Sequence, residues 1–100
     1  MFSNKNINKQ KKAVAVKYSP KDIAPKVIAQ GKGYVAEKII DKADSEKIPV
    51  IEDKALAEDL MNIDLGDYIP PELYEAVAQI LVFITRLDKA GDKKYVPKNK

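Results

Sequence analysis

Acidic side chains are the first group in this chain whose type and spacing could do chemistry. Carboxylate oxygens are the ligands that Ca²⁺ and Mg²⁺ prefer in proteins. Six carboxylates fall within one stretch: Glu52, Asp53, Glu58, Asp59, Asp64 and Asp67. Their spacing matches no calcium-binding loop, and we interpret them as the solvated face of a helix. We therefore expect neither a metal site nor a cofactor.

Two glycines suggest phosphate binding as a second possible chemistry. A helix N-terminus presents free N–H groups to anions, and Gly31-Lys32-Gly33 precedes a stretch with helical periodicity. The remaining residues of a Walker motif or a dinucleotide fingerprint are missing. Glycines between a strand and a helix are more often required by backbone geometry. We therefore favour a structural role for both glycines.

The chain has few of the residue types and motifs that catalysis usually requires. It contains no histidine and no cysteine, and no Gly-x-Ser-x-Gly turn. Several tyrosines could stack on single-stranded nucleic acid, but they fall in different predicted elements, where packing between helix and sheet is the commoner role. These are Tyr18, Tyr34, Tyr68 and Tyr74. The sequence predicts a protein that is not an enzyme.

The net charge of +3 is unevenly distributed along the chain. Residues 1–26 carry seven lysines and one aspartate (+6), residues 27–87 carry six basic and twelve acidic side chains (−6), and residues 88–100 carry five lysines and two aspartates (+3). Arg86 is the only arginine. Nucleic-acid binders usually place lysines and arginines on the folded face that meets the phosphates. An acidic middle with basic ends therefore makes nucleic-acid association the weaker of two functional hypotheses.

The length of 100 residues suits a single domain with one modest core. No apolar run is long enough to cross a membrane, and the polar first residues do not resemble a secretory signal. We expect residues 1–11 to form a flexible basic arm and residues 89–100 a flexible lysine-rich tail. The folded part is then residues 12–88.

Hydrophobic periodicity predicts the elements of that folded part. Residues 13–18 and 25–30 read as strands joined closely enough for an antiparallel pair, and residues 48–52 as a further strand. Residues 34–44 have apolar positions at helical spacing, which predicts a strand–helix–strand unit with parallel strands. The expected fold class is α/β (mixed α+β), with a small mixed sheet flanked by three to four helices.

Two further helices are predicted in the second half. Asp53 is a plausible N-cap for a helix over residues 54–62. Pro70 and Pro71 suit the first turn of a terminal helix, which we expect to be the main packing element. Its apolar stripe comprises Leu73, Ala76, Val77, Ile80, Leu81, Ile84 and Leu87.

Several segments in this order resemble the FlhB/YscU family of type III export proteins, which includes SpaS. They are residues 13–18 (AVAVKY), 24–33 (APKVIAQGKG), 48–52 (IPVIE) and 69–78 (IPPELYEAVA). Each segment alone is a weak signal, whereas the combination is specific. The resemblance covers residues 12–88 and implies the C-terminal cytoplasmic domain of such proteins, as a free-standing version without the transmembrane portion.

The self-cleavage motif of FlhB-like proteins, Asn-Pro-Thr-His, is altered here. The corresponding positions are Asn8, Lys9, Gln10 and Lys11. In the family's cleavage the Asn side-chain nitrogen attacks its own backbone carbonyl, a route that a following proline favours because proline has no backbone N–H. With lysine following, the free backbone nitrogen of Lys9 can attack the Asn8 side chain instead, which leads to slow deamidation. We therefore predict a chain that does not cleave itself.

The resemblance implies a non-catalytic role in docking export substrates and controlling their specificity at the flagellar export gate. Implied partners are an FlhA-like gate component, the membrane part of FlhB, rod- and hook-type substrates and the length-control protein. The implied location is the cytoplasm, including the inner face of the cell membrane beside the export apparatus. By matching motifs, the family's shallow apolar docking depression comprises Ala24, Pro25, Ala78 and Leu81. The helical stripe alone would instead favour a core role for the last two.

Overall fold

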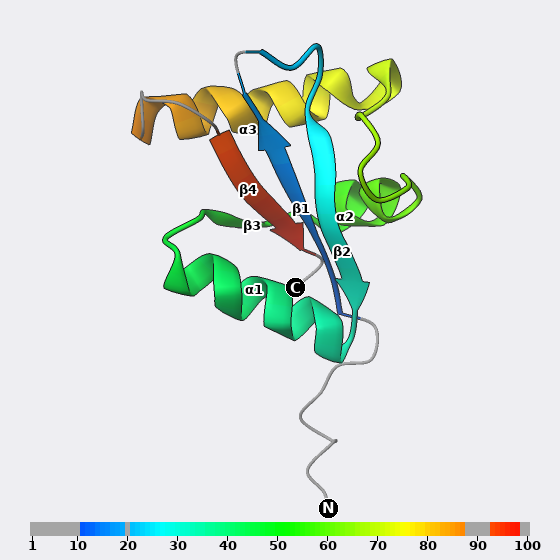
Figure 1. Cartoon of the computed structure of the whole chain (residues 1–100), viewed down its shortest axis with the longest axis vertical. Helices are drawn as coiled ribbons and strands as arrows, with labels where there is room; N and C mark the ends of the chain where they lie inside the picture. The colour runs from blue at the N-terminus through cyan, green and yellow to red at the C-terminus, as the bar shows by residue number, and fades with distance from the viewer. Residues whose placement is uncertain (1–10, 20, 88–92, 99–100) are drawn as a thin grey trace, which may run out of the picture.

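The computed structural model describes residues 11–19, 21–87 and 93–98 (Figure 1). Within these residues, four strands form one sheet, and three α-helices and one 3₁₀ helix accompany them. In chain order the elements are β1 (Lys12–Tyr18), β2 (Lys26–Lys32), α1 (Tyr34–Ser45), β3 (Val50–Glu52), α2 (Lys54–Met61), η2 (Pro71–Leu73), α3 (Tyr74–Leu87) and β4 (Lys93–Lys98).

The sheet is mixed, with the strand order β2-β1-β4-β3. β1 is antiparallel to both β2 and β4, and β4 is parallel to β3. β2 and β3 consequently run in the same direction, as predicted for the two strands that α1 connects, but β1 and β4 lie between them. The predicted α/β fold class and the antiparallel β1–β2 pair are confirmed.

The end of the chain departs from the prediction of a flexible tail over residues 89–100. Residues 93–98 form β4, an interior strand of the sheet, in which Tyr95, Val96 and Pro97 are buried. The prediction was wrong because the lysines around these residues mask a short apolar run. Residues 93–98 therefore belong to the folded part of the chain, and this last strand completes the sheet.

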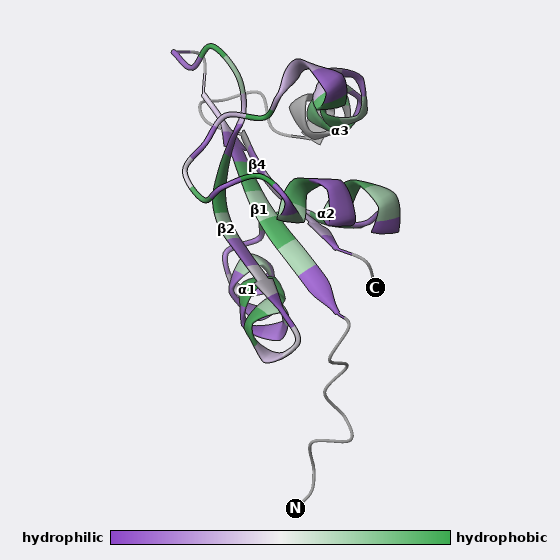
Figure 2. Ribbon diagram, turned by 90° about the vertical axis from the view of Figure 1, so that its right-hand side faces the viewer, coloured by the Kyte–Doolittle hydropathy of each residue, from purple (hydrophilic) through white to green (hydrophobic). Residues whose placement is uncertain are grey.

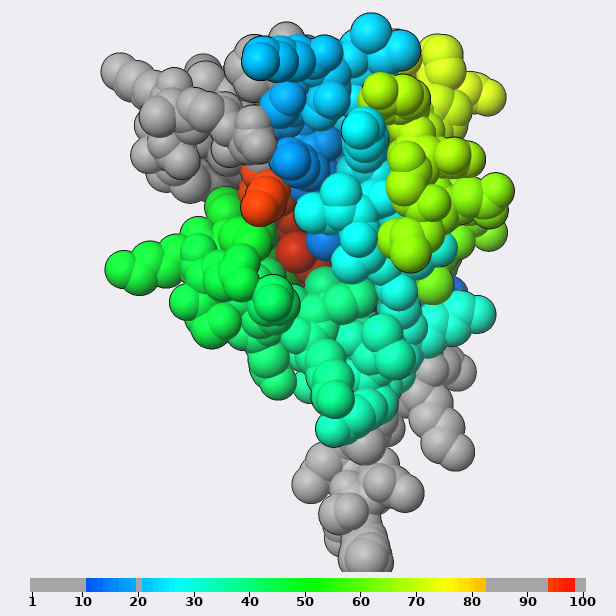
Figure 3. Space-filling model, viewed as in Figure 1, coloured from blue at the N-terminus to red at the C-terminus, as the bar shows by residue number. Residues whose placement is uncertain are grey.

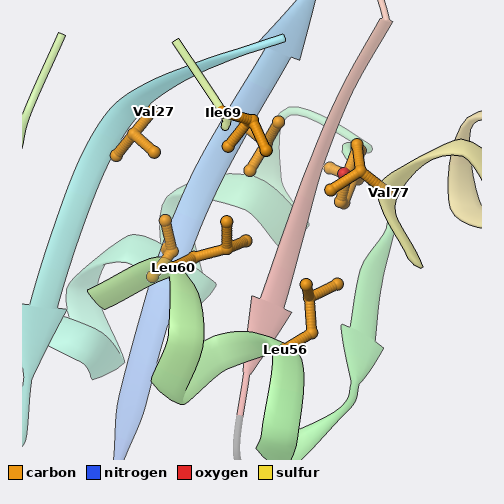
Figure 4. Packing of buried hydrophobic residues seen from close by; sticks show 8 residues of the cluster. Val27, Leu56, Leu60, Ile69 and Val77 are labelled. Atoms are coloured by element: carbon orange, nitrogen blue, oxygen red, sulfur yellow. The ribbon is translucent and has the colours of Figure 1, made fainter. Parts of the chain in front are cut away.

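The helices lie on opposite faces of the sheet, with α1 on one face and α2 and α3 on the other (Figure 2). Side chains from β1, β2, α2 and α3 converge on the second face, where Val27, Leu56, Leu60, Ile69 and Val77 meet (Figure 4). A smaller cluster under α1 contains Ala36, Ile40 and Ala43. Both faces of the interior strands are therefore buried in part.

Local sequence explains where the first two helices begin. Gly33 precedes α1 with a φ of 56°, a conformation that glycine adopts without steric cost. Its N–H donates to the carbonyl of Lys11 at 2.7 Å, so this amide is not available to a phosphate. Asp53 caps α2 as predicted, because its carboxylate accepts a hydrogen bond from the N–H of Leu56 at 3.1 Å.

The terminal helix begins as predicted after two prolines. Pro71–Leu73 forms the 3₁₀ turn, and α3 continues from Tyr74. Among the α3 side chains that the structure describes, which end at Val82, only Val77 is fully buried. Others of the predicted stripe, namely Ala76, Ile80 and Leu81, are half-buried against the core. The described half of α3 thus rests on the core through one edge and leaves much of its surface open.

Candidate docking site

A hollow of about 280 Å³ opens between α3 and the segment that leads into β2. All four residues of the predicted docking depression, Ala24, Pro25, Ala78 and Leu81, line this hollow. The structure therefore brings together two parts of the chain that are far apart in sequence. Their docking role remains a prediction.

Four further residues line the hollow that the sequence-based set did not include. They are Tyr18, Ile23, Tyr74 and Val77. Tyr74 could have been found from sequence, because it lies one helical turn before Ala78 and shares its face. Tyr18 and Ile23 flank the turn between β1 and β2, and their position depends on how that turn folds. Hydrophobic periodicity in the sequence does not predict how this turn folds.

A compact turn positions the wall that carries Ala24 and Pro25. The N–H of Asp22 donates to the carbonyl of Ser19 at 2.9 Å, and the Asp22 carboxylate accepts from the N–H of Ser19 at 3.1 Å. The same carboxylate lies 4.0 Å from the Lys26 ammonium. Ala24 and Pro25 beyond this turn are both buried, and they line the hollow as one of its walls.

Backbone hydrogen bonds connect the two walls of the hollow. The N–H of Ile69 donates to the carbonyl of Pro25 at 2.7 Å, directly before the prolines that start the terminal helix. Val27 donates to Asp67 at 3.0 Å, and Gly66 donates to Val27 at 2.7 Å. The segment before α3 therefore runs along the outer edge of β2, and it fixes α3 relative to Pro25.

The lining of the hollow is apolar and accessible. Ile23 is 85% exposed and Tyr74 45% exposed, although both are large hydrophobic residues. Ala78 is exposed and Leu81 is half-buried, so neither is the fully buried core residue that the helical stripe alone would favour. The lining residues carry no carboxylate or amine. Such a surface can bind apolar side chains of an extended peptide, but it offers no acid–base pair for catalysis.

Most positions of the altered cleavage motif, Asn8, Lys9 and Gln10, lie outside the described residues. Lys11 is described, and it is anchored rather than part of a free arm. Its ammonium lies 3.3 Å from the Glu37 carboxylate of α1, and its carbonyl accepts the Gly33 N–H. The boundary of the predicted arm therefore falls before Lys11.

The other chemistries considered from sequence find little support in the described part of the chain. Within residues 11–19, 21–87 and 93–98, no three His, Cys, Asp or Glu side chains gather in a group that could hold a metal ion. Three tyrosines expected to pack between helix and sheet lie at the surface instead: Tyr74, which lines the hollow, and Tyr34 and Tyr68, which lie near the ammonium groups of Lys38 and Lys26 respectively. They lie on different elements, so they do not form one stacking platform.

The sequence reasoning missed the one buried tyrosine, Tyr95 of β4. It is 0% exposed, and its hydroxyl has no hydrogen-bond partner among the residues that the structure describes. Burial disfavours the ionised phenolate, which raises the pKa of Tyr95 above its ordinary value.

The described helices include none that is both long and apolar enough to span a membrane.

Fold and site together define a small α/β domain with an accessible apolar hollow between α3 and the segment that leads into β2. The sequence profile of the FlhB HrpN YscU SpaS family matches residues 7–84. The chain therefore belongs to this family, as its motifs predicted. The profile includes both walls of the hollow and ends before β4.

Individual relatives agree with this assignment. The uncharacterized protein YlqH of Bacillus subtilis is 46% identical over 85 residues, which cover 84% of this chain and 91% of YlqH. The flagellar biosynthetic protein FlhB of Aquifex aeolicus is 43% identical over 74 residues, 72% of this chain and 21% of that protein. The hypersensitivity response secretion protein HrcU of Ralstonia nicotianae is 30% identical over 86 residues, 85% of this chain. The chain thus spans nearly all of YlqH and about a fifth of the Aquifex FlhB.

Proposed function

We propose that this protein is a non-catalytic component of a flagellar type III export apparatus, and that it docks export substrates in the hollow between Pro25 and α3. Family membership and relatives named for flagellar biosynthesis and for secretion support a component of such an apparatus. The observation that carries the docking role is that Ala24, Pro25, Ala78 and Leu81 line one apolar hollow.

The shape and chemistry of the hollow indicate what it would bind. Small side chains at Ala24 and Ala78 leave a depression, and the large exposed side chains of Ile23 and Tyr74 can close over a bound group. An extended peptide that carries one or two apolar residues satisfies this arrangement. We infer that rod- and hook-type substrates supply such a segment, and that specificity control follows from which segments fit.

The proposed place of action is the cytoplasmic face of the membrane, beside an FlhA-like gate component and the membrane part of FlhB. A length-control protein is a further proposed partner, since substrate specificity must change during assembly. Since we predict a chain that does not cleave itself, any switch in this protein would operate through binding. Each of these partners is a proposal that rests on family membership.

A binding assay with matched variants tests the docking role. Fluorescently labelled N-terminal peptides of rod- and hook-type flagellar proteins are titrated with the purified chain. Ala78→Asp should weaken binding by roughly tenfold or more, because it places an unpaired charge where an apolar group must dock. Val82→Asp is the control, since Val82 is exposed on the same helix but does not line the hollow. Equal binding by all three proteins would contradict the proposal.

Salt dependence separates this function from nucleic-acid association. Apolar docking should change little between low and moderate salt, whereas binding to phosphates falls steeply as counterions compete. A labelled single-stranded oligonucleotide is the comparison ligand. Tight, salt-sensitive oligonucleotide binding that Ala78→Asp leaves unchanged would favour the nucleic-acid alternative.

A further inference from the structure

The last strand of the chain occupies an interior position of the sheet. β4 lies between β1 and β3 and pairs with both strands. On the β3 side, the N–H of Val96 donates to the carbonyl of Pro49 at 3.0 Å, and the Lys98 carbonyl accepts from the N–H of Asp53 at 2.7 Å. The family profile ends at residue 84, so it covers β1 and β3 but not the strand between them. The family-matched part of this chain therefore contains a slot one strand wide.

The backbone of β4 is poorly suited to an interior strand. Pro97 lies in the middle of the sheet, paired with Ile51 of β3. Proline has no N–H to donate to a ladder, and it is usually confined to edge strands, strand starts or bulges. Any other residue at position 97 could donate a backbone hydrogen bond to the sheet. Pro97 cannot, although it lies in an interior strand.

The largest side chain of β4 carries a second mismatch. Tyr95 is fully buried among Val14, Val16 and Leu60, and no group in the described part of the chain forms a hydrogen bond with its hydroxyl. A buried hydroxyl that has lost water without gaining a partner opposes burial of the strand that carries it. Disagreements of this kind between a residue and its position are expected at sites where function overrides stability.

The slot nevertheless accepts only strands whose side chains have particular sizes and directions. The position of Tyr95 faces the cluster under α2 and α3, and the position of Val96 faces the cluster under α1. An occupant must therefore be an extended strand with a large apolar residue followed by a small one. The β4 strand of another copy meets these demands, because exchange repeats the same contacts and changes only the chain that supplies them.

We propose that β4 is an exchangeable strand, and that the slot between β1 and β3 binds the β4 strand of a second copy of this chain. Figure 3 shows that β4 reaches this face of the molecule only in a small area between α1 and β1. Exchange therefore requires β4 to leave as a unit, and it exposes Ala13, which is 0% exposed when β4 is in place. This binding site is separate from the docking hollow.

Cysteine pairs give a direct test, because the natural chain contains no cysteine. Ala13 of β1 and Lys98 of β4 are directly opposite each other in the sheet. The single variants Ala13→Cys and Lys98→Cys are mixed and oxidised. A disulfide-linked heterodimer is expected, since β4 of one copy would pair with β1 of the other. Ala13→Cys mixed with Asp41→Cys, on the exposed face of α1, is the control and should not cross-link.

The double variant Ala13→Cys/Lys98→Cys in one chain controls for folding and geometry. It should form an internal disulfide that holds β4 in its own slot. A fluorescent peptide of residues 91–100 should bind the natural chain saturably and bind this oxidised variant at least about tenfold more weakly, because the slot can no longer empty. A peptide with Tyr95→Asp should also bind about tenfold more weakly than the natural one.

Hydrogen exchange gives a measurement on the unmodified protein. The amides of Val96 and Asp53 depend on β4, whereas the amide of Val27 bonds to Asp67 and does not. Exchange at the first two should be at least about tenfold faster than at Val27 if β4 opens without global unfolding. Equal protection of all three amides, together with no heterodimer and no peptide binding, would overturn the proposal.

Discussion

The backbone N–H of Ile69 donates a hydrogen bond of 2.7 Å to the carbonyl of Pro25. This contact joins the residue before the Pro70-Pro71 pair to the Ala24-Pro25 pair, and Ile69 itself is buried in the core. The two motifs that best identify the family in the sequence therefore meet in space. Their meeting gives the hollow one wall from each motif.

Removing the cap of α2 should destabilise the protein modestly. Asp53→Ala loses the hydrogen bond from the Leu56 N–H to the carboxylate, which typically costs about 1 kcal/mol. Urea denaturation of both proteins measures the difference in free energy of unfolding. Asp59→Ala, an exposed change within the same helix, is the control and should stay within about 0.5 kcal/mol of the natural chain.

Gly31→Ala should destabilise by about 1 to 3 kcal/mol, because the added Cβ would overlap the Val35 side chain. Val35→Ala removes the methyl group nearest to the added Cβ but keeps the Cβ of residue 35, which is also close, so the double variant should recover only part of the loss. Val35 is largely exposed, and its own truncation should cost little. Strictly additive free energies of unfolding in this cycle would show that the close approach has no energetic effect.

Tyr95→Phe should stabilise the protein or leave it unchanged at neutral pH, because the buried hydroxyl that it removes has no hydrogen-bond partner within residues 11–19, 21–87 and 93–98. The pH dependence has a definite sign. Burial raises the pKa of Tyr95 in the folded state, so the unfolded chain ionises first, near pH 10. The free energy of unfolding of the natural chain should fall as pH rises beyond that value. Tyr95→Phe should not show the part of this fall that comes from ionisation of the Tyr95 phenol.

Measurements of the free energy of unfolding at neutral pH and above pH 10 check this difference. The lysines titrate in both proteins, so their effect cancels in the comparison. An advantage of Tyr95→Phe that stays constant across this range would show that the phenol ionises as easily in the folded state as in the unfolded one.

The chain should remain intact on purification and storage. Lysine follows Asn8 where relatives with the cleavage motif have proline, so the side chain is expected to deamidate slowly instead of cutting the backbone. Intact-mass spectrometry should find one polypeptide, with a gradual gain of about one dalton at Asn8 as the amide becomes a carboxylate. Fragments that begin at Lys9 would show that cleavage does not require the proline.

Sequence reasoning found those elements whose periodicity is strong. Helix α1, the Asp53 cap and the proline start of the terminal helix follow from local patterns, and four of the eight residues that line the hollow follow from family motifs. It failed at β4, where lysines surround Tyr95 and a proline follows. Local propensity argued against an interior strand there, and only pairing with β1 and β3 makes it one.

The roles of Ile23 and Tyr18 in the hollow were missed for a related reason. An isoleucine that is 85% exposed has no periodic partner, and its position depends on the Ser19–Asp22 hydrogen bonds rather than on a strand or helix pattern. Turns that are closed by particular side chains carry little signal in hydrophobic periodicity.

A chemical-shift titration tests the docking account most directly. The isotope-labelled chain is titrated with an unlabelled N-terminal peptide of a hook-type substrate. The account predicts saturable shifts that centre on Ala24, Ala78 and Leu81, and their loss in Ala78→Asp. Saturable shifts that instead centre on α1, and that persist in that variant, would contradict it.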